Sequence, residues 1–440
     1  MNKNTLNIFL FVVGLLAHVR VHIVGMIGIS EILICLAAPL YLIKDFNALR
    51  RDGFLRMLTL MALTCIGCLV ASWYNHTPFG DMIRGFATPV VFLCSFVFFH
   101  HFLRGQVNSL KWLLAGLALT IPISLLVNGV SVEEVMAGTE MNEIGDSKYL
   151  MSVLASPLFT LPVFLFYTRM PVIMSASILF LGGLFKISTT ASGRSAGLVL
   201  FAAALLVLIG GRSKVKMFRI RKHFLLYFIL GIVGVVIAKN IYSAAAVRGY
   251  LGYVAEEKYV QQTTTGNGVV DLLIGGRGEV FMGAYAAIHQ PIIGFGPWAI
   301  DWKGYADEFR QKFGYYDYEE ESKRARYLAL MGYGSYVHRI PAHSCLIGGW
   351  LWYGIFGLIM WLYILHLVFK FFMKATDAVP QWWPLFSVLL PRFLWDIFFS
   401  PFGARVQVAA IVVALLFAIG AASGRIKLDP DATKEKFLNW

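Results

Sequence analysis

Apolar residues in this chain come in continuous blocks, and the length of these blocks most constrains the fold. Each block runs for about 18–22 residues, which as a helix crosses the hydrocarbon core of a bilayer. Of the 440 residues, 58% are hydrophobic and only 14% are charged, whereas a soluble domain carries about 25% charged residues. The sequence therefore predicts an all-α polytopic membrane protein. It excludes a disordered chain, a disulfide scaffold, a coiled coil and a barrel of short alternating strands.

The apolar blocks predict about twelve transmembrane helices. They lie at 6–19, 26–43, 54–72, 84–103, 111–128, 150–168, 171–188, 195–210, 223–242, 343–369, 381–399 and 404–422. The first block is short, so its separation from the second is the weakest point of this count. The chain divides accordingly into nine helices at 1–242, a long loop at 243–342, three helices at 343–422 and a tail at 423–440.

Basic residues predict how the chain is oriented, because they collect in cytoplasmic loops. With a cytoplasmic N-terminus, the densest basic run at 212–222 and the basic tail at 423–440 both lie inside, while the outer loop at 129–149 is acidic. These inner loops account for the net charge of +13, so we expect no nucleic-acid partner. Both termini are expected to be cytoplasmic, with the loop 243–342 on the outer face.

Known cofactor motifs give no support for a metal or a nucleotide. The chain has no Gly-Lys-Ser/Thr phosphate loop and no His-Glu-x-x-His. Cys65 and Cys68 have the spacing of a redox or metal pair, but they lie within a predicted span and have no second pair. We therefore expect no cofactor.

Three charged residues that are far apart in sequence meet at the outer face once this topology is imposed. Arg194 opens the eighth span, Arg277 precedes a helix-like run in the long loop, and His343 lies where that loop re-enters the membrane. An arginine fork binds phosphate through paired hydrogen bonds, and histidine can act as a general base. Each also has a structural interpretation, as interfacial anchor, solvated charge or packing residue respectively. His338 and Arg339 lie close by and are an alternative working pair.

Two further arginines near outer span ends have acidic neighbours. Arg392 and Asp396 are four residues apart in the eleventh span, so we expect them to neutralise one another across a helical turn. Arg84 has Asp81 three residues before it at the start of the fourth span. A substrate contact by Arg392 or Arg84 is the lesser interpretation.

Several short motifs lie between residues 185 and 370. The long loop contains Gly276-Arg277-Gly278-Glu279 and then the turn at 289–296, a His-Pro-x-x-Gly-x-Gly-like element with Gln290 interposed. The loop exit carries His343-Ser344 followed by Gly354-Ile355-Phe356-Gly357, and Ser192-Gly193-Arg194 precedes the loop. Together these motifs resemble those of the O-antigen ligase and O-antigen polymerase superfamily, in which the loop exit matches the re-entry motif and Ser192-Gly193-Arg194 matches an earlier Ser-Arg element, with Gly193 inserted.

The resemblance covers about residues 185–370 by motif, and the whole chain by span number and loop placement. It implies a GT-C-like glycosyltransferase of the bacterial inner membrane that takes a glycan from undecaprenyl diphosphate at the periplasmic face. By the same resemblance, the arginines matching Arg194 and Arg277 contact the donor diphosphate, and the histidine matching His343 lies near the reaction centre. No metal or nucleotide sugar is implied.

Two activities share these motifs. A polymerase passes the growing chain to the next lipid-linked repeat unit, and a ligase passes it to lipid A-core; we favour the polymerase. We expect aromatic residues of the long loop, Trp298 or Trp302 among them, to hold the acceptor sugar. A chain-length regulator or a flippase fits this interpretation as a protein partner. A lipid-linked glycan transporter and a non-catalytic assembly scaffold remain alternatives, the former disfavoured because no similarity between two halves is visible.

Overall fold

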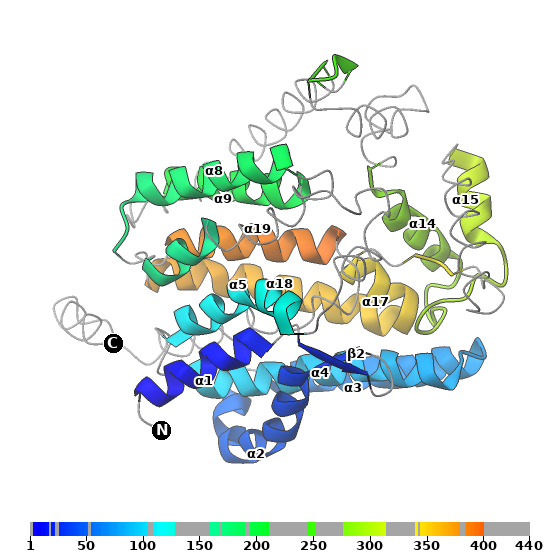
Figure 1. Cartoon of the computed structure of the whole chain (residues 1–440). Helices are drawn as coiled ribbons and strands as arrows, with labels where there is room; N and C mark the ends of the chain where they lie inside the picture. Colours follow the sequence, from blue (N-terminus) through cyan, green and yellow to red (C-terminus); the bar gives the residue numbers. More distant parts are fainter. Residues whose placement is uncertain are drawn as a thin grey trace.

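The computed structural model describes most of the predicted spans. It describes residues 3–16, 19–22, 26–51, 54–103, 109–127, 159–166, 169–189, 194–210, 244–245, 247–250, 276–313, 339–341, 344–378 and 383–399. These residues form mainly α-helices (Figure 1). The helices are α1 Lys3–Leu15, α2 Ile29–Arg51, α3 Phe54–Tyr74, α4 Phe79–Leu103, α5 Leu110–Val127, α8 Val172–Thr189, α9 Arg194–Gly210, α14 Gly276–His289, α15 Tyr305–Phe313, α17 Cys345–Tyr353, α18 Ile355–Ala378 and α19 Trp383–Phe399.

Two of the described helices, α3 and α4, are long and apolar enough to cross a membrane. Shorter apolar stretches occur at Asn4–Leu15, Val172–Lys186, Gly197–Ile209 and Ile355–Lys370. Each of these segments overlaps a block that the sequence predicts as a span. The predicted spans 223–242 and 404–422, the acidic loop 129–149 and the tail 423–440 lie outside the described residues.

The axes of helices α3, α4, α8, α9, α18 and α19 lie in roughly the same direction, whereas those of α14 and α15 lie at an angle to them (Figure 1). Packing proceeds from α2 and α4 through α3 to α18 and α17, then to α19, α9 and α8, while α1 packs on α5. Glycines allow the closest approach: a Cβ atom on Gly116 of α5 would lie 2.2 Å from the carbonyl oxygen of Phe11 on α1. Small residues of this kind are how apolar helices come together without a hydrophobic driving force in lipid.

A short β-hairpin, which the sequence did not predict, separates α1 from α2. Strand β1 (Arg20–His22) pairs antiparallel with β2 (Met26–Gly28), with Val21 opposite Ile27. Both of these facing residues are β-branched and favour extended backbone. The first two predicted spans are therefore separate helices.

The predicted span 343–369 is two helices instead of one. Helix α17 ends at Tyr353, and α18 begins at Ile355. Between them Gly354 adopts a φ of 62°, where a side chain is strained, and a Cβ atom there would lie 2.0 Å from the carbonyl oxygen of Ile292. The break exists because another segment of the chain touches the backbone at this point.

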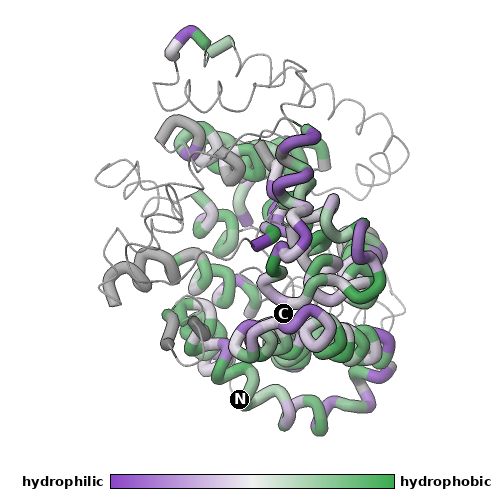
Figure 2. The backbone as a smooth tube through the Cα atoms, turned by 90° about the vertical axis from the view of Figure 1, so that its right-hand side faces the viewer, coloured by the Kyte–Doolittle hydropathy of each residue, from purple (hydrophilic) through white to green (hydrophobic). Residues whose placement is uncertain are grey.

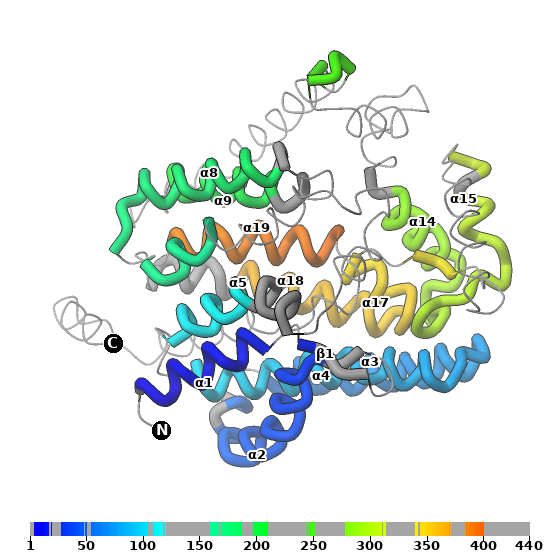
Figure 3. Tube along the Cα trace, in the orientation of Figure 1, coloured from blue at the N-terminus to red at the C-terminus, as the bar shows by residue number. Residues whose placement is uncertain are grey.

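One end of the bundle collects segments that are far apart in sequence. The turn between α3 and α4, helices α14 and α15, and α17 all lie at this end, on the right in Figure 3. The helix-like run that the sequence predicts after Arg277 is confirmed as α14, Gly276–His289. Figure 2 looks onto this end and shows hydrophilic segments in front of mainly hydrophobic helices.

Candidate functional site

The segment that follows α14 is tied to the end of α3. The Asn75 side-chain amide donates a hydrogen bond to the carbonyl oxygen of Gly294 over 2.9 Å. The Gln290 amide donates to the same carbonyl over 2.6 Å and to Asn75 Oδ1 over 3.2 Å. Gln290, the residue that interrupts the family-like turn, therefore holds that turn against the α3–α4 connection.

The same segment lies against the break between α17 and α18. The amide of Phe295 donates to the carbonyl of Leu351 over 2.7 Å, and that of Ile355 donates to Ile292 over 3.0 Å. Gly294 has a φ of 77°, and a Cβ atom on it would lie 2.5 Å from the amide nitrogen of Gly354. The turn at 289–296 and the loop-exit motif, which lie apart in the sequence, thus meet backbone to backbone.

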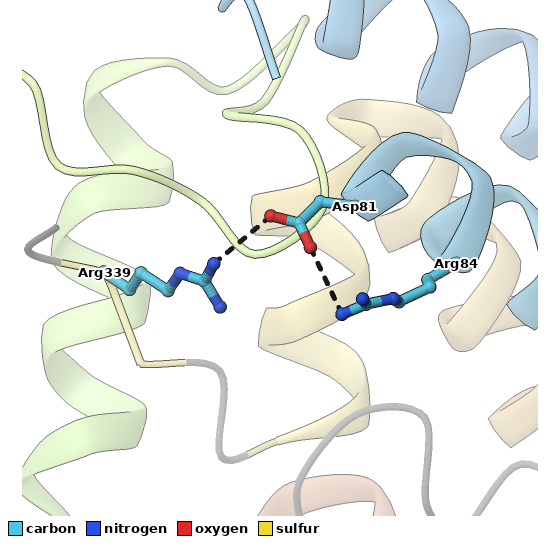
Figure 4. A network of polar contacts seen from close by, with 3 residues as sticks. All are labelled: Asp81, Arg84 and Arg339. Atoms are coloured by element: carbon cyan, nitrogen blue, oxygen red, sulfur yellow. Dashed lines mark hydrogen bonds and ion pairs between the residues drawn. The ribbon is translucent and has the colours of Figure 1, made fainter. Parts of the chain in front are cut away.

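Asp81, Arg84 and Arg339 form an ion cluster beside this junction (Figure 4). Arg84 Nη1 lies 3.5 Å from Asp81 Oδ1, and Arg339 Nη2 lies 3.3 Å from Asp81 Oδ2. The Asp81 side chain is only 10% exposed, whereas those of Arg84 and Arg339 are 45% and 49% exposed. Asp81 lies in the first turn of α4, where the helix dipole stabilises a negative charge.

The segment 297–300 lies against Arg339 and against Gly85, the neighbour of Arg84. Arg339 forms an isolated antiparallel bridge with Ile300, and the next amide, that of Ile340, donates to the Ala299 carbonyl over 2.8 Å. On the other side, Gly85 beside Arg84 leaves room for Pro297, since a Cβ atom on Gly85 would lie 2.0 Å from Pro297 Cγ.

The two tryptophans expected to hold a sugar differ in exposure. Trp298 stacks on Trp352 at a centroid distance of 4.6 Å, and Arg84 Cζ lies 5.8 Å from its ring. Its ring is thus already in contact with the protein. Trp302 is 69% exposed, so its ring faces remain accessible to a ligand.

The loop re-enters the bundle at a fixed point. Ser344 caps α17 by accepting a hydrogen bond from the Ile347 amide over 3.2 Å, and its hydroxyl donates to the Ile397 carbonyl of α19 over 2.9 Å. His343 and His338, both predicted as site residues, lie outside the described residues. Ser344, the described residue that follows His343, thus bonds to both α17 and α19.

Arg194 and Arg277 each lie at a helix start. Arg194 is the first residue of α9, which packs on α8 and α19, and Arg277 is the second residue of α14. Their side chains lie outside the described part of the structure. Backbone N–H groups at a helix start favour an anion, which is compatible with the predicted contact to a phosphate.

Arg392 and Asp396 form the predicted pair, with Arg392 Nε 3.0 Å from Asp396 Oδ2. The expected contact across one helical turn is thus confirmed. Lys186 of α8 lies within electrostatic range of Arg392, and sequence reasoning missed it. The sequence offered a signal for Lys186, because it lies near the outer end of a predicted apolar span, where a charged side chain is costly unless it is paired or functional.

Helices α14 and α15 pack through an aromatic cluster. The Tyr285 hydroxyl donates to Glu308 Oε1 over 2.6 Å, and His289 stacks on Tyr305 at 4.5 Å. The hydrogen bond to Glu308 raises the pKa of Tyr285 above its ordinary value, and desolvation and the Glu308 charge act in the same direction. Asp301 caps α15 by accepting from the amides at its start.

No group of three or more His, Cys, Asp or Glu side chains is placed to hold a metal ion within the described ranges. No disulfide joins the five cysteines, all of which lie in described helices. No protein-family model matches the chain, and neither a curated protein nor a solved structure matches it.

Proposed function

We propose that the protein is a polytopic glycosyltransferase of the bacterial inner membrane. It crosses the membrane about twelve times, with both termini in the cytoplasm and the loop 243–342 on the periplasmic face. The length and apolar composition of α3 and α4 support membrane insertion. The positions of basic residues in the sequence support the orientation.

The reaction transfers an oligosaccharide from undecaprenyl diphosphate to an acceptor sugar with inversion. The acceptor hydroxyl attacks the anomeric carbon, the bond from that carbon to the diphosphate oxygen breaks, and its electron pair leaves with the diphosphate. His343 takes the proton that the hydroxyl loses. Arg277 and Arg194 neutralise the charge that develops on the leaving group.

One observation carries this proposal: the segment 290–299 fastens the end of α14 to both the α3–α4 turn and the α17–α18 break. Hydrogen bonds from Asn75 and Gln290 and the contact between Gly294 and Gly354 make this connection. Helix α14, which carries Arg277, and Ser344, which follows His343, therefore belong to one connected end of the bundle (Figure 3). A rigid framework of this kind is what preorganised charges require.

The acceptor distinguishes a polymerase from a ligase. We favour a polymerase, whose acceptor is the next lipid-linked repeat unit; with lipid A-core as the acceptor the same chemistry is a ligase reaction. In a deletion strain, single repeats on lipid A-core indicate a polymerase. Full-length chains that accumulate on the carrier lipid indicate a ligase.

The direct test uses the purified full-length protein in vesicles with a lipid-linked oligosaccharide as both donor and acceptor. Mass spectrometry should detect extended glycans and released undecaprenyl diphosphate, without added metal. A His343→Ala variant of equal abundance should form neither product. Movement of the lipid-linked glycan across the bilayer without any new glycosidic bond would establish a transporter and overturn the proposal.

Topology has its own test. A cysteine introduced at Gly314 should react with a membrane-impermeant maleimide added to the periplasmic side, whereas one at Ser213 should not. Because the chain has five native cysteines, both substitutions are made in a variant in which these are replaced by serine or alanine. The reverse labelling pattern would place the proposed site on the cytoplasmic face and refute the proposed reaction.

A further inference from the structure

Arg392 of α19 is fixed through its Nε atom, which donates to Asp396 Oδ2 over 3.0 Å. The Asp396 side chain is only 7% exposed, so this contact anchors the guanidinium inside the bundle. Among the described residues, neither terminal nitrogen of Arg392 has a hydrogen-bond or ion-pair partner. A guanidinium bonded only through Nε still presents both NH₂ groups to an anion.

A second cation lies within electrostatic range of Arg392. It is Lys186 of α8, whose side chain is partly buried. Both residues lie within predicted apolar spans, where charged side chains are costly and are normally paired or functional. Two cations this near one another attract the same anion, and the attraction is stronger where water is scarce.

Helix packing places Lys186 at the same level as Arg194. The short connection 190–193 makes α8 and α9 antiparallel neighbours, and α9 also packs on α19. A Cβ atom on Gly183 of α8 would lie 3.0 Å from the carbonyl oxygen of Gly197 on α9. Lys186 follows Gly183 by three residues and Arg194 precedes Gly197 by three, so both positions lie at the connected end of the two helices.

The ion pair on α19 is joined to the exit of the long loop. The Ser344 hydroxyl donates to the carbonyl oxygen of Ile397 over 2.9 Å, and Ile397 directly follows Asp396. Ser344 in turn directly follows His343, the proposed base. The bond from Ser344 therefore reaches α19 one residue away from the carboxylate that holds Arg392.

We propose that Lys186 and Arg392 bind the diphosphate of the lipid-linked donor. This inference rests on the proposed function and deepens it, because it adds two residues to the donor site of Arg194 and Arg277. Arg392 supplies paired N–H donors in one plane, Lys186 supplies a point charge, and Asp396 orients Arg392. Anionic phospholipids carry phosphate too, so the tests must separate them from the donor.

Native mass spectrometry of the purified full-length protein with undecaprenyl diphosphate measures binding without turnover. Lys186→Gln and Arg392→Lys should each weaken the affinity for this lipid by at least tenfold. The affinity for undecaprenol, which has the same hydrocarbon chain without phosphate, should change by less than twofold. The control Lys303→Gln removes an exposed positive charge from the long loop and should bind undecaprenyl diphosphate like the wild type. Wild-type affinity in either test variant, or equal losses for the two lipids, would overturn the inference.

A paired substitution separates a ligand contact by Arg392 from its ion pair with Asp396. Arg392→Gln/Asp396→Asn removes both charges and can keep a hydrogen bond between the two side chains, so the melting temperature should stay near that of the wild type. Affinity for undecaprenyl diphosphate should still fall at least tenfold. Full affinity in this variant would show that Arg392 only pairs with Asp396, and the inference would fail.

Competition with phosphatidylglycerol identifies the source of the phosphate. An equal concentration of phosphatidylglycerol should leave undecaprenyl diphosphate bound, and its displacement would show a general phospholipid site and overturn the assignment to the donor. If the wild type binds undecaprenyl diphosphate through these residues yet forms no glycosidic bond, the proposed function fails while the diphosphate site is retained. If Lys186→Gln forms glycosidic bonds at the wild-type rate with the donor below saturation, the inference fails while the proposed function is retained.

Discussion

Gly294 and Gly354 lie so close that a Cβ atom on Gly294 would be 2.5 Å from the Gly354 amide nitrogen. Both glycines have positive φ, 77° and 62°. The contact joins the end of α14 to the break between α17 and α18. The contact makes the polar end of the bundle one packed unit. It leaves no room for a side chain at either glycine.

Substitution of Gly354 by alanine should destabilise the protein strongly. The new Cβ atom would lie 2.0 Å from the Ile292 carbonyl oxygen, in addition to the strain of positive φ. Gly304→Ala measures the backbone strain alone, since Gly304 has a φ of 72° and open space around it. This substitution should lower the free energy of unfolding by roughly 1–2 kcal/mol. Apparent melting temperatures in detergent should therefore fall further for Gly354→Ala. Equal shifts for the two variants would contradict the close contact.

Asn75 and Gln290 should be energetically coupled. Each donates to the Gly294 carbonyl, and they also bond to one another. A double-mutant cycle with alanine, measured by chemical unfolding in mixed micelles, should give a coupling energy of about 0.5–1.5 kcal/mol. Thr59, whose hydroxyl bonds within its own helix, is the control partner. The changes that Gln290→Ala and Thr59→Ala make in the free energy of unfolding should add to within about 0.5 kcal/mol.

Alkaline pH should weaken the α14–α15 pair through Tyr285. Its pKa is raised above the ordinary 10.0, chiefly by the hydrogen bond to Glu308. The protonated phenol is favoured in the folded state, so its stabilisation is complete below pH 10 and is lost as pH rises through the folded-state pKa. The melting temperature should fall less steeply above pH 10 for Tyr285→Phe than for the wild type. Tyr74→Phe, at an exposed tyrosine, should retain the wild-type slope.

Lysine should replace Arg277 and Arg194 poorly if they grip a diphosphate, because a point charge cannot reproduce the paired geometry of a guanidinium. Loss of one such stabiliser typically lowers the rate by about 10²–10³-fold. In a complementation assay at equal expression, Arg277→Lys and Arg194→Lys should lose most polymer. Arg219→Lys, in the predicted cytoplasmic run, should remain near wild type. Normal polymer from Arg277→Lys would eliminate the diphosphate contact.

Local sequence predicted the features that depend on a few neighbouring residues. Apolar blocks predicted α3 and α4, because a long run of apolar side chains favours a membrane-length helix. The spacing of Arg392 and Asp396 predicted their ion pair, since residues four apart face one another on a helix. The helical run before His289 likewise identified α14.

Tertiary structure decided which distant residues meet. No local pattern relates Asp81 to Arg339, and their ion pair exists only because the loop exit pairs with Ile300 beside the start of α4. The division of the predicted span 343–369 at Gly354 likewise depends on Ile292, which approaches from another segment. Apolar content determines where helices form, because each helix satisfies its own backbone hydrogen bonds. Contacts between helices and loops depend on the shapes of both partners, which one stretch of sequence does not contain.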